Sequence, residues 1–256
     1  MTTAFAISAH PDDIEFLMAG TLMALRDAGC AIHYMTLSDG NLGSTTMDGP
    51  TTAAKRGAEA MAAAARIGAV FHSSIGHDLD IFYDRPTLAQ VASVMRDVSP
   101  DIVLTHAPVD YMEDHMNTCR LVVTAAFARG MPNFVVDPPR PAVMKPVAVY
   151  HAQPYSNRDP LNRPVMPDFF VDVSDLEDDK VAMLALHASQ KRWLDESQGL
   201  DSYLQMMRDL DAAVGNLSGQ YRFAEGWRRH LHLGFCAAGH DPLCRLLAKR
   251  IIEARS

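Results

Sequence analysis

Short, mostly apolar runs alternate with helical segments along the first half of this 256-residue chain, and this alternation limits the folds it can adopt. The runs are too short for helices and are bounded by turn residues, whereas two of the segments between them end at Gly29 and Gly68. The expected strands are residues 4–8, 31–37, 69–72 and 101–105. A β-α-β rhythm predicts an α/β protein with a Rossmann-like, mostly parallel central sheet flanked by helices.

A histidine and two acids follow the first apolar run directly, in the motif Ala9-His10-Pro11-Asp12-Asp13. Imidazole and carboxylate are ordinary zinc ligands, and a catalytic zinc keeps three protein ligands and one open position. Pro11 fixes one backbone angle and favours an extended His10, so the turn is partly pre-organised. An alternative is that Asp12 or Asp13 only caps a helix that begins near Glu15. Capping accounts for one acid but not for the histidine.

A second polar segment, residues 105–115, follows the strand expected at 101–105 and contains His106 and His115. The carboxyl ends of parallel strands meet at one edge of a sheet, where α/β proteins bind their ligands. We therefore expect the two polar segments to converge there and to form a metal site.

These two segments together resemble the LmbE-like, or PIG-L, family of zinc-dependent N-deacetylases. Asp114-His115 and the Ala9–Asp13 motif carry most of the resemblance, which extends over much of the chain. Supporting matches are Thr36-Leu37-Ser38-Asp39-Gly40, Arg56, Glu59, Lys180 and His187-Ala188-Ser189-Gln190.

The resemblance implies zinc ligands His10, Asp13 and His115, with Asp12 as the general base for a metal-activated water. The implied reaction removes an N-acetyl, or another N-acyl, group from an amino sugar or glycoconjugate. Zn²⁺ is the expected cofactor, with Fe²⁺ or another divalent ion as the alternative. An alternative function is a metal-containing, sugar-binding or regulatory protein of the same fold with weak or no turnover.

One position departs from the family pattern. The family commonly has a second histidine three residues before the ligand histidine, where it stabilises the oxyanion or donates a proton, and here that residue is Met112. A thioether does neither, so His106 or Tyr111 is a candidate replacement. Asp114, which orients that histidine in the family, is a third candidate for acid or oxyanion support, or the N-cap of a helix over residues 116–129.

Substrate contacts are expected from Arg56, Asp80 and His151. Arg56 lies one helical turn before Glu59, so the alternative is a solvent-exposed ion pair. Asp80 is chosen from three acids of one loop, the others being Asp78 and Asp84, and all three are alternatively solvent-facing. His151 ends a strand expected at 146–151, and the alternative is a half-buried histidine bonded to backbone.

Composition restricts the remaining possibilities. A chain of this length with 48% hydrophobic residues is expected to form one domain over residues 1–256, with an irregular segment at 132–167 and a helical carboxyl-terminal part. The net charge of -8 argues against nucleic acid as a partner and fits a neutral or cationic product better. The family resemblance implies that the small-molecule partner is an amino sugar or glycoconjugate. No signal peptide or membrane span is apparent, and four scattered cysteines favour a cytoplasmic protein. The family resemblance implies a homo-oligomer.

Further motifs in the second half are interpreted as structural. A further strand is expected at residues 168–173, and after it Ser174 and Glu177 have capping-box spacing ahead of a helix that carries Lys180 and His187. The helical segment 193–214 is expected to serve the core or a subunit contact. A metal site at His230-Leu231-His232, completed by His240-Asp241, needs more assumptions than a surface or oligomer contact. We therefore expect the contact.

Overall fold

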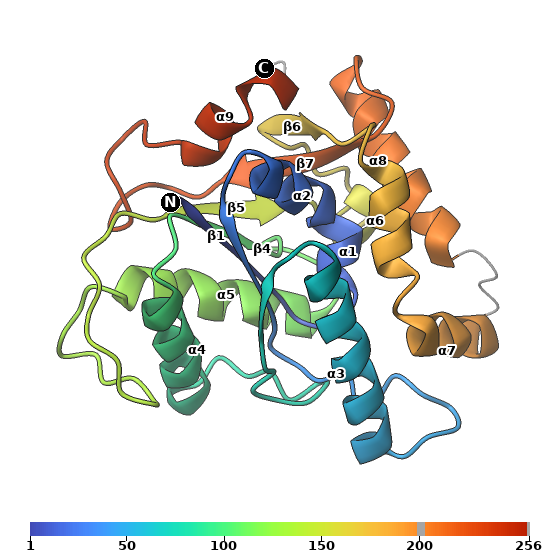
Figure 1. Cartoon of the computed structure of the whole chain (residues 1–256), viewed down its shortest axis with the longest axis horizontal. Coiled ribbons are helices and arrows are strands. Elements are labelled where there is room, and N and C mark those ends of the chain that lie inside the picture. Colours follow the sequence, from blue (N-terminus) through green and yellow to red (C-terminus); the bar gives the residue numbers. More distant parts are fainter. Residues whose placement is uncertain (199–202, 255–256) are drawn as a thin grey trace.

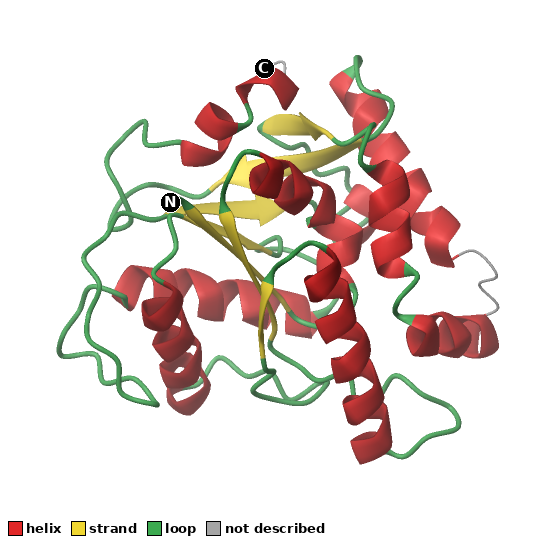
Figure 2. Cartoon of the chain, in the orientation of Figure 1, coloured by secondary structure: helices red, strands yellow, loops and turns green. Residues whose placement is uncertain are grey.

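The computed structural model describes residues 1–198 and 203–254, and its centre is one mixed sheet with the strand order β3-β2-β1-β4-β5-β7-β6-β8 (Figures 1 and 2). The strands are β1 (Thr3–Ser8), β2 (Ala31–Thr36), β3 (Val70–His72), β4 (Ile102–Thr105), β5 (Ala148–Ala152), β6 (Phe169–Asp172), β7 (Ala224–Arg229) and β8 (Ile251–Glu253). The predicted α/β class with a mostly parallel sheet is confirmed.

The parallel half of the sheet determines where the polar segments meet. Strands β1 to β5 run parallel, and β1 lies between β2 and β4. Ile7 pairs with Thr105, and Thr105 pairs with His151, so β1, β4 and β5 end at the same edge. The strand order reverses between β1 and β4, and such a reversal opens a crevice outside the carboxyl ends.

Helices cover both faces of the sheet (Figure 1). They are α1 (Asp13–Leu17), α2 (Ala19–Asp27), α3 (Gly49–Arg66), α4 (Arg85–Val98), α5 (Glu113–Ala128), α6 (Glu177–Leu184), α7 (Ala188–Gln198), α8 (Tyr203–Ser218) and α9 (Pro242–Leu246), with short 3-10 turns η1 (Tyr155–Asn157) and η2 (Ala248–Arg250). The larger apolar cluster joins α1, α2, α3, α6 and α8 to one face and includes Leu22 and Trp227. The second cluster packs α4 and α5 on the other face through residues such as Val91 and Leu121.

The far end of the sheet is antiparallel. Strand β7 pairs antiparallel with both β5 and β6, and β8 pairs antiparallel with β6. The strand expected at 168–173 is β6, whereas β7 and β8 were not predicted. Strand β7 includes several charged side chains, so it lacks the apolar run by which buried strands are recognised, and β8 is only three residues long.

Three helix starts differ from expectation. The first helix begins at Asp13 and is interrupted at Met18, whose φ of -140° separates α1 from α2. Asp12 is at the N-cap position of α1 but makes no capping hydrogen bond, so the capping interpretation is wrong. Helix α5 begins at Glu113 with Met112 at its N-cap, so Asp114 is not the cap.

The predicted capping box is also wrong. Leu176, not Ser174, is at the N-cap position of α6, and the Ser174 hydroxyl instead donates to the carbonyl of Phe223. The Lys180 ammonium is fully buried and lies 2.5 Å from Asp211 Oδ2 and 2.8 Å from Glu225 Oε1. These buried ion pairs fit the structural role expected for Lys180.

The expected helix at 193–214 falls on α7 and α8, and residues 199–202 within it lie outside the described part of the chain.

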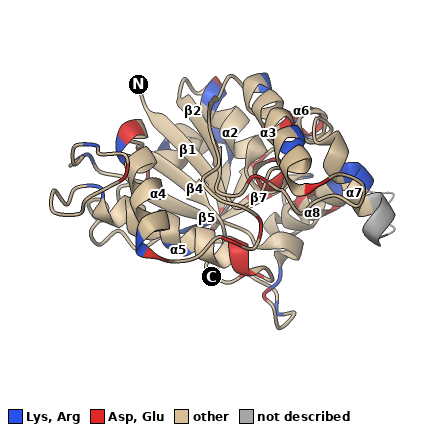
Figure 3. Cartoon of the chain, turned by 90° about the horizontal axis from the view of Figure 1, so that it is seen from below, with Lys and Arg blue, Asp and Glu red and all other residues tan. Residues whose placement is uncertain are grey.

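Among the described helices, none is long and apolar enough to cross a membrane. Lys and Arg are spread over several elements in the view of Figure 3.

Candidate metal centre and active site

The turn after β1 is closed by its own hydrogen bonds. The His10 N–H donates to Asp13 Oδ2 at 2.7 Å, and the Asp13 N–H donates to the His10 carbonyl at 3.3 Å. Asp12, between them, has a φ of 105°, a region that side-chain-bearing residues rarely adopt. Strained backbone of this kind is concentrated at functional sites. The turn therefore holds its three polar side chains in fixed and different directions.

The structure brings His10, Asp13 and His115 together, with one potential ligand atom from each lying within 4.8 Å of the others. His115 Nε2 is 3.3 Å from Asp13 Oδ1, and His10 Nδ1 is 3.5 Å from Asp13 Oδ2. His115 is in the first turn of α5, whereas the other two belong to the turn after β1. Two histidine nitrogens and one carboxylate oxygen form a donor set that suits zinc.

Two further carboxylates orient the histidine rings. His10 Nε2 donates to Asp114 Oδ2 at 2.9 Å, and His115 Nδ1 donates to Asp110 Oδ1 at 3.0 Å. Each ring therefore turns its remaining nitrogen toward Asp13. His115 Nε2 is buried and makes no hydrogen bond within the described part of the chain. A carboxylate behind each ligand histidine is the usual support of a zinc site, so these residues fit a bound divalent cation.

The charges of the site also favour a cation. Burial alone lowers the pKa of His10, but its hydrogen bonds to Asp114 and Asp13 raise it to about 9. Burial likewise lowers the pKa of His115, while the charge of Asp13 and the bond to Asp110 raise it to about 10. Burial would raise the pKa of Asp13, yet the rings of His115 and His106 hold it well below its usual value. The carboxylates that stabilise these protons also stabilise a metal ion in their place.

His106 is fully buried behind this group. Its Nε2 accepts the Ala9 N–H at 2.9 Å, and its ring stacks on that of His115 with centroids 4.0 Å apart. Burial and the charge of His115 lower its pKa, so the ring is neutral. His106, Asp110 and His115 form a second group with metal-ligand spacing, but all three are buried. The geometry therefore favours the His10 group, which reaches solvent, and does not favour His106 as an acid.

Tyr111 lies at the mouth of the site. Its ring meets the His115 ring edge to face with centroids 5.7 Å apart, and its side chain is 54% exposed. Burial of the hydroxyl and the charge of Asp13 raise its pKa, so the phenol keeps its proton and can donate it in a hydrogen bond. Met112 is half-buried, and its N–H donates to Asp110 Oδ1 at 3.2 Å.

Asp12 is held by two residues from distant helices. The Tyr203 hydroxyl of α8 donates to Asp12 Oδ2 at 2.6 Å, and Arg56 Nη2 of α3 is 3.7 Å from Asp12 Oδ1. Burial is the main cause that raises the pKa of Asp12 to about 6, and the charge of Asp13 adds to it while Arg56 opposes it. Sequence reasoning did not identify Tyr203, because nothing in the local pattern distinguishes it from a core residue.

Arg56 is not the solvent-exposed partner of Glu59. Its buried guanidinium donates to the carbonyl of Pro11 at 2.6 Å and to that of Gly40 at 3.1 Å. A Cβ atom on Gly40 would lie 2.6 Å from Arg56 Nη1, so a glycine is needed at this position. Glu59 instead accepts hydrogen bonds from the backbone and hydroxyl of Ser189. The exposed ion pair is therefore wrong, and Arg56 supports the turn of the metal group.

Of the three loop acids, the structure brings Asp78 rather than Asp80 to the site. Asp78 Oδ1 is 3.9 Å from His10 Nε2, and Asp78 Oδ2 is 3.9 Å from Arg56 Nη1. Asp80 is exposed, and Asp84 caps α4 by accepting the Thr87 N–H at 2.8 Å. Spacing along a loop does not reveal which side chain turns inward, so the choice of Asp80 is not supported by the geometry.

His151 is buried beneath the site rather than at its edge. Its Nδ1 donates to the carbonyl of His106 at 2.9 Å, and its Nε2 accepts from His230 Nδ1 at 2.9 Å. The backbone-bonded alternative is therefore the correct one, with burial deeper than expected.

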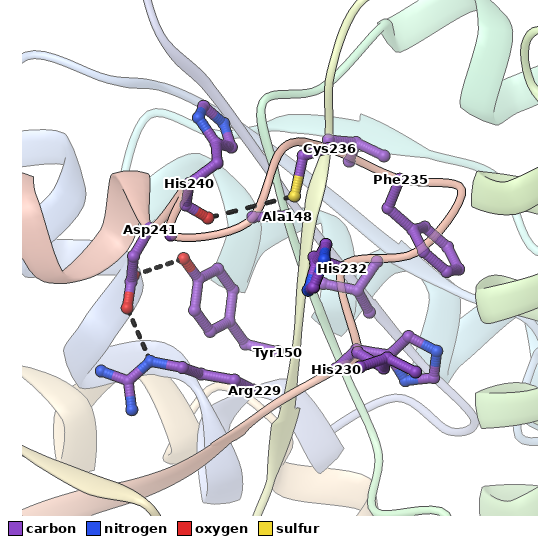
Figure 4. A pocket seen from close by; sticks show the side chains of 13 residues that line it. Ala148, Tyr150, Arg229, His230, His232, Phe235, Cys236, His240 and Asp241 are labelled. Carbon is purple, nitrogen blue, oxygen red and sulfur yellow. Dashed lines mark hydrogen bonds and ion pairs between the residues drawn. The ribbon is translucent and has the colours of Figure 1, made fainter.

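His230 also lines a cavity of about 440 Å³ on the other side of this pair (Figure 4). Tyr150 and Arg229 each donate a 2.6 Å hydrogen bond to Asp241, and both bonds are drawn in Figure 4. His232 and His240 also line this cavity. Within the described residues, these histidines do not form a group with metal-ligand spacing, so the metal interpretation of His230 and His232 is not supported.

Comparisons with known proteins are consistent with this geometry. The model of the family described as PIG-L, GlcNAc-PI de-N-acetylase, matches residues 5–126. The 4-oxalmesaconate hydratase of Pseudomonas putida is 31% identical over 198 residues, which cover 74% of this chain and 74% of the hydratase. The chain belongs to the PIG-L family.

Two deacetylases are also similar to this PIG-L protein. The diacetylchitobiose deacetylase of Thermococcus kodakarensis is 28% identical over 232 residues, covering 87% of this chain and 80% of that protein. The structure of the N,N'-diacetylchitobiose deacetylase of Pyrococcus horikoshii superposes with a TM-score of 0.76 at 23% identity, covering 94% of this chain and 88% of the other. As a member of the PIG-L family, the chain is an enzyme.

Proposed function

We propose that this PIG-L enzyme is a zinc-dependent hydrolase that removes the N-acetyl group of an amino sugar or glycoconjugate. The observation that carries the proposal is the group of His10, Asp13 and His115 with the buried Asp12 carboxylate beside it. The family match and the two similar deacetylases support the same reaction.

The metal ligands and the acids that orient them have separate roles. His10, Asp13 and His115 would hold the cation, and Asp114 and Asp110 would keep the two rings in their ligand orientation. What such a cation supplies when bound is Lewis acidity toward the acyl oxygen and toward water.

Asp12 is positioned to act as the general base. Tyr203 donates to its Oδ2 and Arg56 lies beside its Oδ1, which orients the carboxylate. It takes a proton from the water that adds to the amide carbon, and the proton passes to the amine when the C–N bond breaks, giving acetate and a free amine. Tyr111 packs against His115 and keeps its proton, so it is suited to donate a hydrogen bond to the acyl oxygen in place of a histidine at position 112.

The test is acetate release from N-acetylglucosamine, diacetylchitobiose and a glucosaminyl conjugate by zinc-loaded protein. Asp12→Asn should lower kcat by about 10²–10⁴-fold while the protein keeps its zinc. The matched control is Asp97→Asn, an exposed acid of α4 that is bonded to Arg140 and should leave kcat unchanged. Release that is equally fast in Asp12→Asn would contradict the assignment. If neither the wild type nor the variants release acetate from any of these substrates, the sugar-binding role becomes the better explanation.

A second candidate reaction is the addition of water to a carbon-carbon double bond. The hydratase of Pseudomonas putida is 31% identical to this chain, and Met112 is a specific reason to consider a reaction other than deacetylation. The same zinc-loaded protein should therefore be assayed with 4-oxalmesaconate, followed by loss of the absorbance of the conjugated substrate. Turnover of that compound without acetate release would favour the hydratase function.

A further inference from the structure

Leu79 has an unusual backbone conformation beside the metal group. Its φ is 63°, in the left-handed region that favours glycine, and its side chain is 64% exposed. A glycine adopts this conformation without steric cost, whereas a leucine does not. Because the side chain is largely in solvent, it contributes little to the core. What the leucine adds over a glycine is therefore an apolar surface facing outward.

The backbone of Leu79 is tied directly to the candidate metal centre. Its N–H donates to Asp114 Oδ2 at 2.8 Å, and the same oxygen accepts His10 Nε2 at 2.9 Å. The preceding residue, Asp78, is 3.9 Å from His10 Nε2. The backbone of Leu79 is therefore one hydrogen bond away from the carboxylate that supports His10, beside the candidate metal centre.

Two other exposed apolar side chains lie around the same group. Leu42 is 53% exposed, and its N–H donates to Asp78 Oδ2 at 3.0 Å. Tyr111, described above, packs against His115. Three different loops therefore each place one exposed apolar residue beside the metal group, Leu79 and Leu42 through their backbone bonds to Asp114 and Asp78 and Tyr111 through its ring contact with His115. Apolar surface gathered at a binding site, rather than scattered singly, is typical of ligand recognition.

We propose that Leu79, with Leu42 and Tyr111, forms a subsite for an apolar aglycone, an aryl or alkyl group attached to the amino sugar. This inference rests on the proposed deacetylase function and specifies its substrate class. The acetyl group must reach Asp12 and the metal ligands, so the remainder of the substrate extends toward solvent, where these three side chains lie. A subunit contact through the same side chains is the competing occupant, and the experiment separates the two.

The experiment measures binding without turnover. Isothermal titration of the zinc-loaded Asp12→Asn protein with the phenyl and the methyl β-glycosides of N-acetylglucosamine gives the ratio of their Kd values. The phenyl glycoside should bind about ten-fold more tightly, because its ring removes apolar surface from water. Leu79→Gly in the same background should reduce that ratio to near one, and Leu79→Met should preserve it. Leu161→Gly, at an exposed leucine of another loop, should leave the ratio unchanged.

A thermal melt reports on the backbone argument independently. Leu79→Gly should raise the Tm, because a glycine relieves the left-handed strain, and this also excludes misfolding as the cause of weaker binding. A lower Tm would contradict the premise that the leucine is held against its preference. A preference for the phenyl glycoside that survives Leu79→Gly would overturn the proposal.

Failure of this inference is distinguishable from failure of the proposed function. Acetate release from both glycosides at equal efficiency, with equal Kd values, would overturn only the aglycone subsite. No binding of either glycoside, together with no acetate release by the wild-type enzyme, would overturn both. Sedimentation tests the competing subunit contact. If the wild type is an oligomer that Leu79→Gly dissociates, with no change in the Kd ratio, the surface belongs to a subunit contact instead.

Discussion

The Tyr203 hydroxyl donates a 2.6 Å hydrogen bond to Asp12, although the two residues are 191 positions apart in the chain. Both side chains are buried. Helix α8 therefore completes the site formed by the turn after β1, even though the family match ends at residue 126. The second half of the chain takes part in the proposed chemistry rather than only supporting the sheet.

Replacing Tyr203 by Phe should lower kcat about ten-fold and change KM little, because the loss of one hydrogen bond leaves Asp12 free to rotate away from the water. Steady-state kinetics on the best acylated substrate measures this. The matched control is Tyr34→Phe, which removes another buried phenol that donates to a carboxylate, that of Glu15. It should affect stability but not kcat.

The pair can also be tested by a double-mutant cycle. If Tyr203 acts through Asp12, adding Tyr203→Phe to Asp12→Asn should cause no further loss of kcat. Losses that multiply in the double variant would show that Tyr203 acts on the substrate independently of Asp12.

Asp110 and Asp114 should control metal affinity. Asp110→Asn and Asp114→Asn each remove the negative charge behind one ligand histidine, so each should weaken zinc binding by about 10- to 100-fold. Competition with a chromogenic chelator measures the Kd. Asp97→Asn, which replaces an exposed acid bonded to Arg140, is the control and should not change it. Unaltered zinc affinity in both variants would mean that the cation binds elsewhere.

The parallel half of the fold and the main polar group follow from local sequence signals. Apolar runs located β1, β2 and β4, and the residues just beyond β1 and β4 meet because parallel strands end at one edge. His10, Asp13 and His115 lie together for that reason. Strand β7 was missed because charged side chains interrupt its apolar pattern, and β8 because it is only three residues long.

The supporting residues of the site were harder to predict, because they depend on side-chain direction. Asp110 carries a detectable signal, since it follows β4 in the same polar segment as His106. Asp78 and Asp80 are two positions apart in an irregular loop, where no periodicity distinguishes inward from outward. Tyr203 had no local signal, because only tertiary packing brings α8 to Asp12.

His151 should make the folded protein less stable as the pH falls. Burial lowers its pKa to about 4, so the folded protein keeps it neutral while the unfolded chain, with an ordinary pKa of about 6.5, binds a proton first. Its contribution to the free energy of unfolding is full above pH 6.5 and is lost between about pH 6.5 and 4. The total loss is on the order of 3 kcal/mol.

Urea unfolding of the wild type and His151→Gln at pH 7.5, 5.5 and 4.5 isolates this term from the titration of the carboxylates. The difference in unfolding free energy between the two proteins should shrink as the pH falls. A constant difference across this range would show that the burial of His151 does not suppress its protonation.

Tyr111 and Met112 provide the sharpest test of how this chain manages without the second histidine of the family pattern. Tyr111 is the exposed phenol beside His115, and Met112 is the half-buried N-cap residue of α5. If the phenol stabilises the acyl oxygen, Tyr111→Phe should lower kcat for acetate release by about 10²-fold. Adding Met112→His should restore part of that loss, because an imidazole donor then lies one helical turn before His115. Met112→Leu in the same background is the control, since it changes the thioether without adding a donor, and it should restore nothing. Equal activity of Tyr111→Phe and the wild type would remove Tyr111 from the mechanism, and rescue by Met112→Leu would show that the effect is one of packing.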